Sequence, residues 1–140
     1  MPAKAARVRD CGYYILGADT VVAAGRRILP KAETEADARR CLELLSGRRH
    51  RVITAIVARN PDGLQRERLA ESVVAIAHLT AHQIGAYLAT GEWQGKAGGY
   101  AIQGRAAMLI RFLAGSYSNV VGLPLYETAQ LLRGLGWPLP

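Results

Sequence analysis

Apolar and polar residues alternate in two different periods along the chain, and the change of period divides it into strands and helices. Apolar runs and two-residue alternation predict strand segments at residues 13–18, 21–29, 51–59 and 64–79. The second of these segments folds back at Gly25, which suits a tight hairpin. The sequence NPDG at residues 60–63 predicts the turn that joins the two long strands.

Helical spacing of apolar residues appears in the other parts of the chain. It predicts the end of a helix at residues 3–9 and complete helices at residues 34–46, 80–90 and 125–135. Thr34 with Asp37, and Thr80 with Gln83, have the three-residue spacing of N-terminal capping boxes. Residues 106–115 are expected to begin as a helical turn and to continue as a strand.

The order of these elements predicts the fold class. Strands and helices alternate with hairpins among them, which favours an α/β fold with a mixed, twisted sheet flanked by helices. The chain has 140 residues, a length that suits a single domain over residues 1–140 with a substantial core.

Composition and charge narrow the possible partners. The formal net charge of +7 suggests a polyanionic partner, but it does not choose among a nucleotide, a nucleic acid and an acidic surface. No apolar run reaches the roughly 18 residues of a membrane span, and no signal-peptide pattern follows the basic start, so we expect no membrane partner. Cys11 and Cys41 fit no metal-ligand spacing and are expected to be free thiols.

Three polar features could carry chemistry. Asp19, placed at a strand end beside Thr20, could hold a divalent cation or act as a general base, or could simply bond nearby backbone amides. Lys31 precedes a helix and could bind an anion or be an ordinary exposed lysine. Gln103 ends the glycine-rich segment KAGGYAIQG and could bond a base edge or a phosphate. The histidines at positions 50, 78 and 82 show no ligand spacing.

Five longer segments, taken in order, point further. They are GADTVV at 17–22, ILPKA at 28–32, LLSGRRHRVITA at 44–55, YLATGEWQGKAGGYAIQG at 87–104 and GSYSNVVGLPLYET at 115–128. Together they closely resemble the Maf family of nucleoside triphosphate pyrophosphatases, and the resemblance extends from about Lys4 to Gly136.

The resemblance implies a cytoplasmic, often homodimeric hydrolase with a fold like that of inosine triphosphatase. Such an enzyme converts a nucleoside triphosphate, for example dTTP, UTP or a modified nucleotide, into the monophosphate and pyrophosphate with Mg²⁺ or Mn²⁺. By position, Asp19 matches the family's general base and metal ligand, and Lys31 matches a catalytic lysine. Thr20 and Gln103 match residues that face the nucleobase, and Lys4 matches a lysine of a preceding helix.

The match has differences that leave alternatives open. Pro30 and Ala32 flank Lys31 where the family usually has Gly and Pro. The family's usual first strand and its phosphate-gripping loop have no counterpart, so we expect an N-terminally truncated domain, about the C-terminal two-thirds, with weak or no activity. A different start site, a fragment and a truncated paralogue all fit that expectation.

Two other functions compete with the enzyme. One is an inactive remnant that binds nucleotide or dimerises. The other is a basic nucleic-acid-binding module, which the charge alone suggests and for which no specific motif is present.

Overall fold

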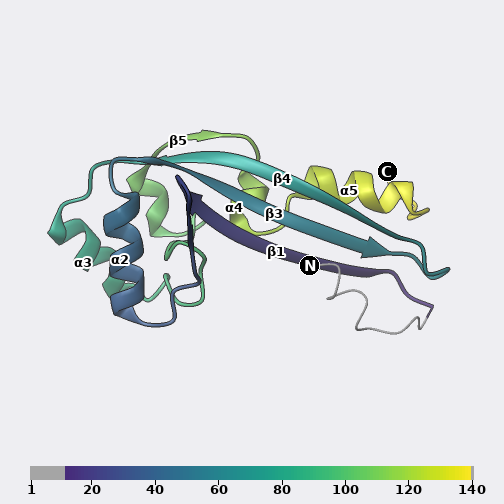
Figure 1. The fold of residues 1–140 in the computed structure, drawn as a ribbon, viewed down its shortest axis with the longest axis horizontal. Coiled ribbons are helices and arrows are strands. Elements are labelled where there is room, and N and C mark those ends of the chain that lie inside the picture. The colour runs from purple at the N-terminus through teal and green to yellow at the C-terminus, as the bar shows by residue number, and fades with distance from the viewer. Residues whose placement is uncertain (1–11, 140) are drawn as a thin grey trace.

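A computed structural model describes residues 12–139, and a five-stranded sheet forms its centre (Figure 1). The strands are β1 (Ile15–Ala24), β2 (Arg27–Leu29), β3 (Arg49–Arg59), β4 (Gln65–Ile76) and β5 (Ile110–Ala114). Their order across the sheet is β2-β1-β3-β4-β5. The helix predicted at residues 3–9 and the free thiol predicted for Cys11 lie outside the described residues.

The predicted α/β class is confirmed, and the sheet is simpler than expected. All four strand pairings among residues 12–139 are antiparallel, whereas the sequence pattern favoured a mixed sheet. Tight turns explain the two hairpins, because a short connection can only reverse the chain. Gly25 turns β1 into β2 at φ 59°, and Asn60 accepts a 2.9 Å hydrogen bond from the amide of Leu64 between β3 and β4.

Strand β1 corrects one expectation that bears on the site. The sequence suggested a strand that stops near Asp19, but β1 continues to Ala24 and pairs with β3 along its length. Asp19 lies opposite Ala55, and Thr20 lies opposite Thr54. Backbone pairing does not require apolar side chains, so the small polar pair Asp19-Thr20 stays within the strand. Asp19 is therefore an interior strand residue, not a strand-end residue.

Helices and one 3₁₀ turn surround the strands. They are α2 (Glu35–Leu45), α3 (Ala81–Ala89), η1 (Arg105–Leu109), α4 (Tyr117–Val121) and α5 (Leu125–Gly134). Both predicted capping boxes are confirmed, with Thr34 accepting from the amide of Asp37 at 3.1 Å and Thr80 accepting from that of Gln83 at 3.1 Å. The predicted change from helical turn to strand is also confirmed, since η1 leads directly into β5.

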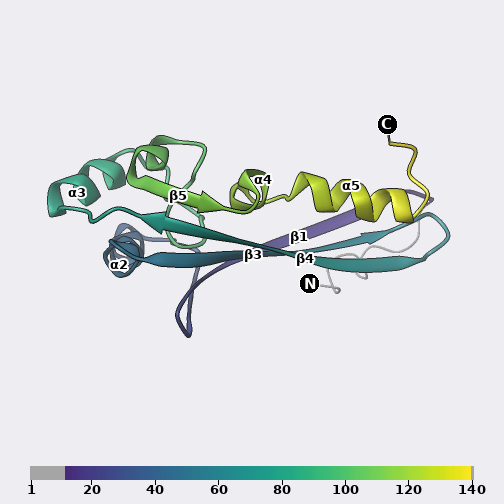
Figure 2. The same cartoon turned by 90° about the horizontal axis from the view of Figure 1, so that it is seen from above.

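The covered face of the sheet carries two hydrophobic clusters. Figure 2 shows α3, α4 and α5 along the same side of the long strands. Near α2 and α3, the strand residues Val22, Val52 and Val74 pack with helix side chains such as Leu42. Near α5, Ile56 and Ala58 of β3 pack with Leu131 and Leu135 in the second cluster. Two polar residues, Thr20 of β1 and Thr54 of β3, lie between the strand residues of the two clusters.

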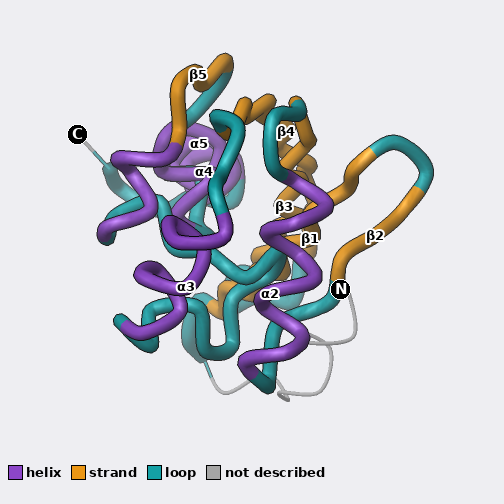
Figure 3. The backbone as a smooth tube through the Cα atoms, turned by 90° about the vertical axis from the view of Figure 1, so that its left-hand side faces the viewer, coloured by secondary structure: helices purple, strands orange, loops and turns teal. Residues whose placement is uncertain are grey.

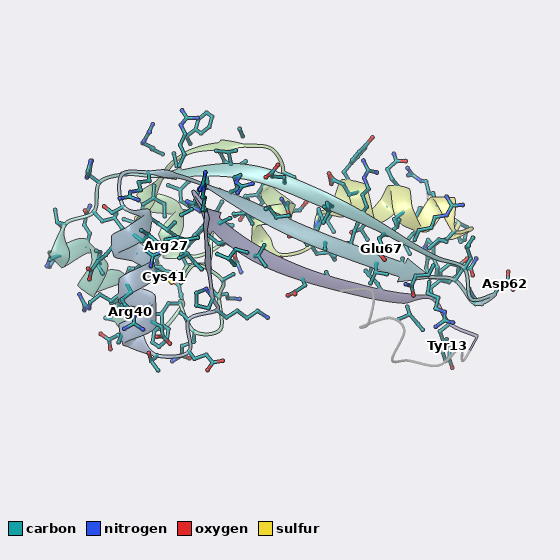
Figure 4. The ribbon with its side chains drawn as sticks, in the orientation of Figure 1. Tyr13, Arg27, Arg40, Cys41, Asp62 and Glu67 are labelled. Atoms are coloured by element: carbon teal, nitrogen blue, oxygen red, sulfur yellow. The ribbon has the colours of Figure 1, made fainter. Side chains whose placement is uncertain are left out.

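The two ends of the molecule differ in structure. Figure 4 shows Arg27, Arg40 and Cys41 at the end built from α2, and Tyr13 and Asp62 at the opposite end. The β1–β2 hairpin projects sideways from the strands (Figure 3). Cys41 is a free, buried thiol, as expected, and burial raises its pKa. Within residues 12–139, no helix combines the length and the apolar character that crossing a bilayer requires.

Candidate functional site

A cleft of about 210 Å³ brings together four of the five residues that the sequence singled out. Asp19 and Thr20 of β1, Lys31 from the segment after β2 and Gln103 from the glycine-rich segment all line it. The fifth, Lys4, lies outside the described residues. The cleft wall is completed by Lys96, Tyr100 and the end of α4 at residues 120–122. Residues 84 positions apart in the sequence therefore share one space.

Strand geometry determines how β1 contributes to the cleft. Successive side chains of a strand point to opposite faces of its sheet. By register, Thr20 shares a face with Thr54, whereas Asp19 shares the other face with Ala55 and the exposed Leu69. Because both residues line the same cleft, the cleft extends around the edge of β1.

Backbone pairing places Lys31 in the cleft. Lys31 forms an isolated antiparallel bridge with Ala97 of the glycine-rich segment. The amide of Ala32 donates to the carbonyl oxygen of Lys96 at 3.0 Å, and the amide of Gly95 donates to the carbonyl oxygen of Ala32 at 2.8 Å. These bonds hold the backbone of two exposed lysines, Lys31 and Lys96, beside each other at the cleft.

Two glycines allow this segment to approach the strand and helix beneath it. Gly98 and Gly99 have φ values of 75° and 77°, which side-chain-bearing residues rarely adopt. A Cβ atom on Gly98 would lie 3.1 Å from the Val22 side chain, and one on Gly99 would lie 3.2 Å from the backbone of Ala38. Gly98 and Gly99 are thus needed both for their conformation and for close packing.

A buried histidine–tyrosine pair anchors the same segment to the sheet. His50 Nε2 lies 2.6 Å from the hydroxyl oxygen of Tyr100, and their rings meet edge to face with centroids 5.5 Å apart. Both residues are buried, at 2% and 5% exposure. Burial lowers the pKa of His50 to about 4 and raises the pKa of Tyr100. The imidazole is therefore neutral at pH 7.

Helix α3 supports the part of the segment that carries Gln103. The hydroxyl of Tyr87 accepts a 3.0 Å hydrogen bond from the amide of Ala101, and burial raises the Tyr87 pKa. Two residues past Gln103, the amide of Arg105 donates to the Glu92 carboxylate at 2.9 Å. The backbone on both sides of Gln103 is thereby fixed, while its side chain remains exposed to the cleft.

A polar network lies under Thr20. The hydroxyl oxygens of Thr20 and Thr54 are 2.8 Å apart, and the Thr54 hydroxyl donates to the carbonyl oxygen of Asn119 at 3.4 Å. The side-chain amide of Asn119 donates through Nδ2 to the carbonyl oxygen of Val52 at 3.2 Å and to Ser72 Oγ at 2.9 Å. Thr54 and Asn119 are both fully buried, so α4 is attached to the sheet by polar contacts rather than by apolar packing alone.

Four of these residues were not predicted from the sequence to belong to the site: His50, Thr54, Lys96 and Tyr100. A signal for two of them was present. In RHRVITA the positions 50, 52 and 54 share one strand face, and Val52 marks that face as buried. Polar residues on a buried face need partners, so His50 and Thr54 could have been identified as parts of a buried network. Lys96 and Tyr100 gave no comparable signal.

The cleft has few side chains that could bind a metal ion, but they suit a divalent cation that is also bound by the phosphates of a ligand. Asp19 is the one carboxylate among the described residues that line the cleft. No group of three or more His, Cys, Asp or Glu side chains that could hold a metal ion occurs within residues 12–139. Mg²⁺ is commonly held by one or two carboxylates together with substrate phosphates, and this chemistry fits Asp19 beside two lysines.

The fold and the cleft define an α/β protein with a mainly cationic binding site at the edge of an antiparallel sheet. The chain belongs to the Maf-like protein family, whose sequence profile matches residues 2–135. The family resemblance expected from the five segments is confirmed.

Curated relatives agree with the family assignment. The chain is 69% identical over 124 residues to the dTTP/UTP pyrophosphatase of Granulibacter bethesdensis, and this aligned region covers 89% of this chain and 58% of the relative. It is 63% identical over 126 residues to that of Maricaulis maris, covering 90% and 61%. It is 64% identical over 130 residues to that of Gluconobacter oxydans, covering 90% and 60%. The chain thus spans about three-fifths of the length of these relatives.

The two roles of glycine in the cleft segment can be separated by a matched pair of variants. Gly95 has φ 71° and open space around it, whereas Gly99 combines a positive φ with close backbone contact to α2. We expect Gly95→Ala to lower the free energy of unfolding by about 1–2 kcal/mol, the conformational cost alone. Gly99→Ala should cost about 1–3 kcal/mol more, because α2 must move. Urea unfolding measures both, and equal losses would contradict the packing role of Gly99.

The His50–Tyr100 pair predicts a pH dependence of stability. The unfolded histidine binds a proton below its ordinary pKa of 6.5, whereas the folded one stays neutral down to about pH 4. The unfolded state therefore binds more protons between pH 6.5 and 4, and acidification in that window destabilises the fold by up to about 3 kcal/mol. The difference in unfolding free energy between wild type and His50→Gln, followed from pH 7 to 4, isolates this contribution. A difference that does not change with pH would contradict it.

Proposed function

We propose that the chain carries the nucleotide cleft of a nucleoside triphosphate pyrophosphatase. The reaction hydrolyses a substrate such as dTTP or UTP between the α and β phosphorus atoms, giving the monophosphate and pyrophosphate. The observation that carries this proposal is the single cleft lined by Asp19, Thr20, Lys31 and Gln103. Relatives that are 69% and 63% identical, and that are named dTTP/UTP pyrophosphatases, support the choice of reaction and substrate.

The charged groups of the cleft have different proposed roles. In this proposal, the Asp19 carboxylate orients a water molecule and accepts its proton as the water attacks the α phosphorus. Lys31 and Lys96 neutralise charge that builds on the phosphate oxygens as the bond to the leaving pyrophosphate breaks. Both ammonium groups extend from paired backbone, so the segments that carry them are fixed before the substrate arrives.

A divalent cation, Mg²⁺ or Mn²⁺, completes the proposed site. Asp19 is the residue that would hold it, together with phosphate oxygens of the substrate. When bound, the cation would supply charge neutralisation at the phosphates and would lower the pKa of a bound water. Strand pairing and the bridge to Ala97, rather than the cation, set the backbone positions of Asp19 and Lys31.

The neutral groups of the cleft suit the nucleobase. Thr20 offers a hydroxyl and Gln103 offers an amide, and neither would compete for the phosphates. A site that forms hydrogen bonds with a nucleobase discriminates strongly between bases, because a wrong base leaves buried polar groups of the site unpaired.

Other parts of the family resemblance stay predictions. They are the homodimer, the cytoplasmic location and the role of Lys4. The molar mass of the purified chain in solution tests the dimer directly.

Substitution of Asp19 tests the proposed chemistry. We expect Asp19→Asn to lower kcat for dTTP and UTP by about 10²–10⁴-fold, because the amide cannot accept the proton. Affinity for UTP, measured in EDTA so that no cation contributes, should not fall, because the substitution removes a negative charge beside the phosphates. Asp62→Asn is the matched control, since Asp62 is exposed in the turn at the far end of the molecule (Figure 4).

The outcomes separate the competing functions. Full activity of Asp19→Asn would overturn the catalytic role of this carboxylate. A wild-type chain that binds UTP but does not hydrolyse it would support the non-catalytic nucleotide-binding alternative. Tight binding to DNA that weakens steeply with salt and ignores free nucleotides would support the nucleic-acid-binding alternative instead.

A further inference from the structure

The hydroxyl of Thr20 has a defined hydrogen-bond polarity, and this polarity bears on which nucleobase the cleft accepts. We propose that Thr54, which lies beneath Thr20, makes Thr20 an acceptor only and thereby selects bases with an imino N–H group. Uracil and thymine carry such a group at N3, whereas cytosine has a bare ring nitrogen there. The inference rests on the proposed function, because it takes the ligand of the cleft to be a nucleotide.

The carbonyl oxygen of Asn119 belongs to the short helix α4. In a longer helix, the amide four residues on would donate to it. Helix α4 ends at Val121, however, and the amide of Leu123 donates instead to the carbonyl oxygen of Ser118 at 3.1 Å. Asn119 is fully buried, and a buried carbonyl oxygen left without a donor costs stability. The Thr54 hydroxyl, 3.4 Å away, provides it.

The Thr54 hydroxyl has a single hydrogen to donate. Its side chain is fully buried, so solvent offers no alternative partner. When its hydrogen points to Asn119, the Thr54 oxygen can only accept from Thr20. The 2.8 Å separation of the two hydroxyl oxygens is a normal hydrogen-bond length, and Thr20 must then be the donor of that bond.

Thr20 presents hydrogen-bond acceptors to the cleft. Its hydrogen points down toward Thr54, so its remaining lone pairs face outward. Thr20 is half-buried and lines the cleft, which leaves these lone pairs accessible to a ligand. A base N–H can donate to them, whereas a bare ring nitrogen would bring two lone pairs together without a hydrogen.

Gln103 cannot make this distinction by itself. An amide group presents a donor and an acceptor and can exchange them by a half-turn of its end. The exposed Gln103 side chain is therefore able to serve either kind of base. Thr20 lacks that freedom because Thr54 and Asn119, both inside the protein, set its orientation.

The test compares UMP and CMP binding to the 140-residue chain in EDTA, by titration calorimetry or ligand-observed NMR. Wild type should bind UMP at least about tenfold more tightly than CMP, since a lost hydrogen bond at a buried polar group costs about that factor or more. Thr54→Val frees the Thr20 hydrogen, so CMP should bind more tightly while UMP changes little, and the ratio should fall to within about threefold. Thr54→Ser keeps the hydroxyl and should keep the wild-type ratio.

Thr20→Val adds a contrasting signature. It removes the acceptor, so UMP binding should weaken while CMP binding stays at its low level. A merely structural role for either threonine would weaken both nucleotides together. Thermal unfolding of each variant shows whether it is folded at the temperature of the titration.

The outcomes for the inference and for the proposed function differ. Equal binding of UMP and CMP by wild type, or an unchanged ratio in Thr54→Val, would overturn the inference even if UTP is hydrolysed. Selective UMP binding that is lost in Thr54→Val would support the inference even if UTP is not hydrolysed, which would overturn only the proposed catalysis. A wild-type chain that binds neither monophosphate would overturn the inference, whereas UTP hydrolysis by the same chain tests the proposed function separately.

Discussion

The backbone pairing between residues 30–32 and 95–98 is the interaction on which the cleft depends. It joins a segment that follows the β1–β2 hairpin to one that follows α3, about 65 residues later in the chain. Without it, neither lysine of the cleft would have a fixed position relative to Asp19. Because the bonds are made by backbone groups, they depend less on side-chain identity than on two glycines, Gly98 and Gly99, that let the segments approach.

The sheet beneath the cleft mixes apolar packing and polar contacts in an ordered way. One apolar cluster lies toward the end of the sheet near α2 and α3, and the other lies toward the end near α5. Between them, Thr54 bonds Thr20 and Asn119. Beyond Val52, at the end nearer α2, His50 bonds Tyr100 of the first cluster. Buried polar groups of this kind cost stability unless each finds a partner, and in return they fix direction as well as position. Direction is what the proposed nucleotide site needs.

Much of this arrangement could be predicted from the sequence. Local signals located the capping boxes at Thr34 and Thr80 and the hairpin at Gly25, because they depend on residues a few positions apart. The ordered segments identified the family and, through it, the residues that meet in the cleft. The antiparallel sheet and the continuous course of β1 through Asp19 were missed, because strand pairing depends on contacts distant in sequence. The bonds of Thr54 and Tyr100 were missed for the same reason, since each partner lies 34 to 65 residues away.

The central claim is that separate segments form one nucleotide site beside β1. Amide chemical shifts recorded while UTP is titrated into the isotope-labelled chain in EDTA test it most directly. The account predicts that the largest shifts fall at Thr20, at Lys31, across residues 95–103 and at residues 120–122, the positions that line the cleft. Shifts concentrated instead around Ala55 and Leu69, around Arg27 and Arg40, or absent throughout, would contradict it.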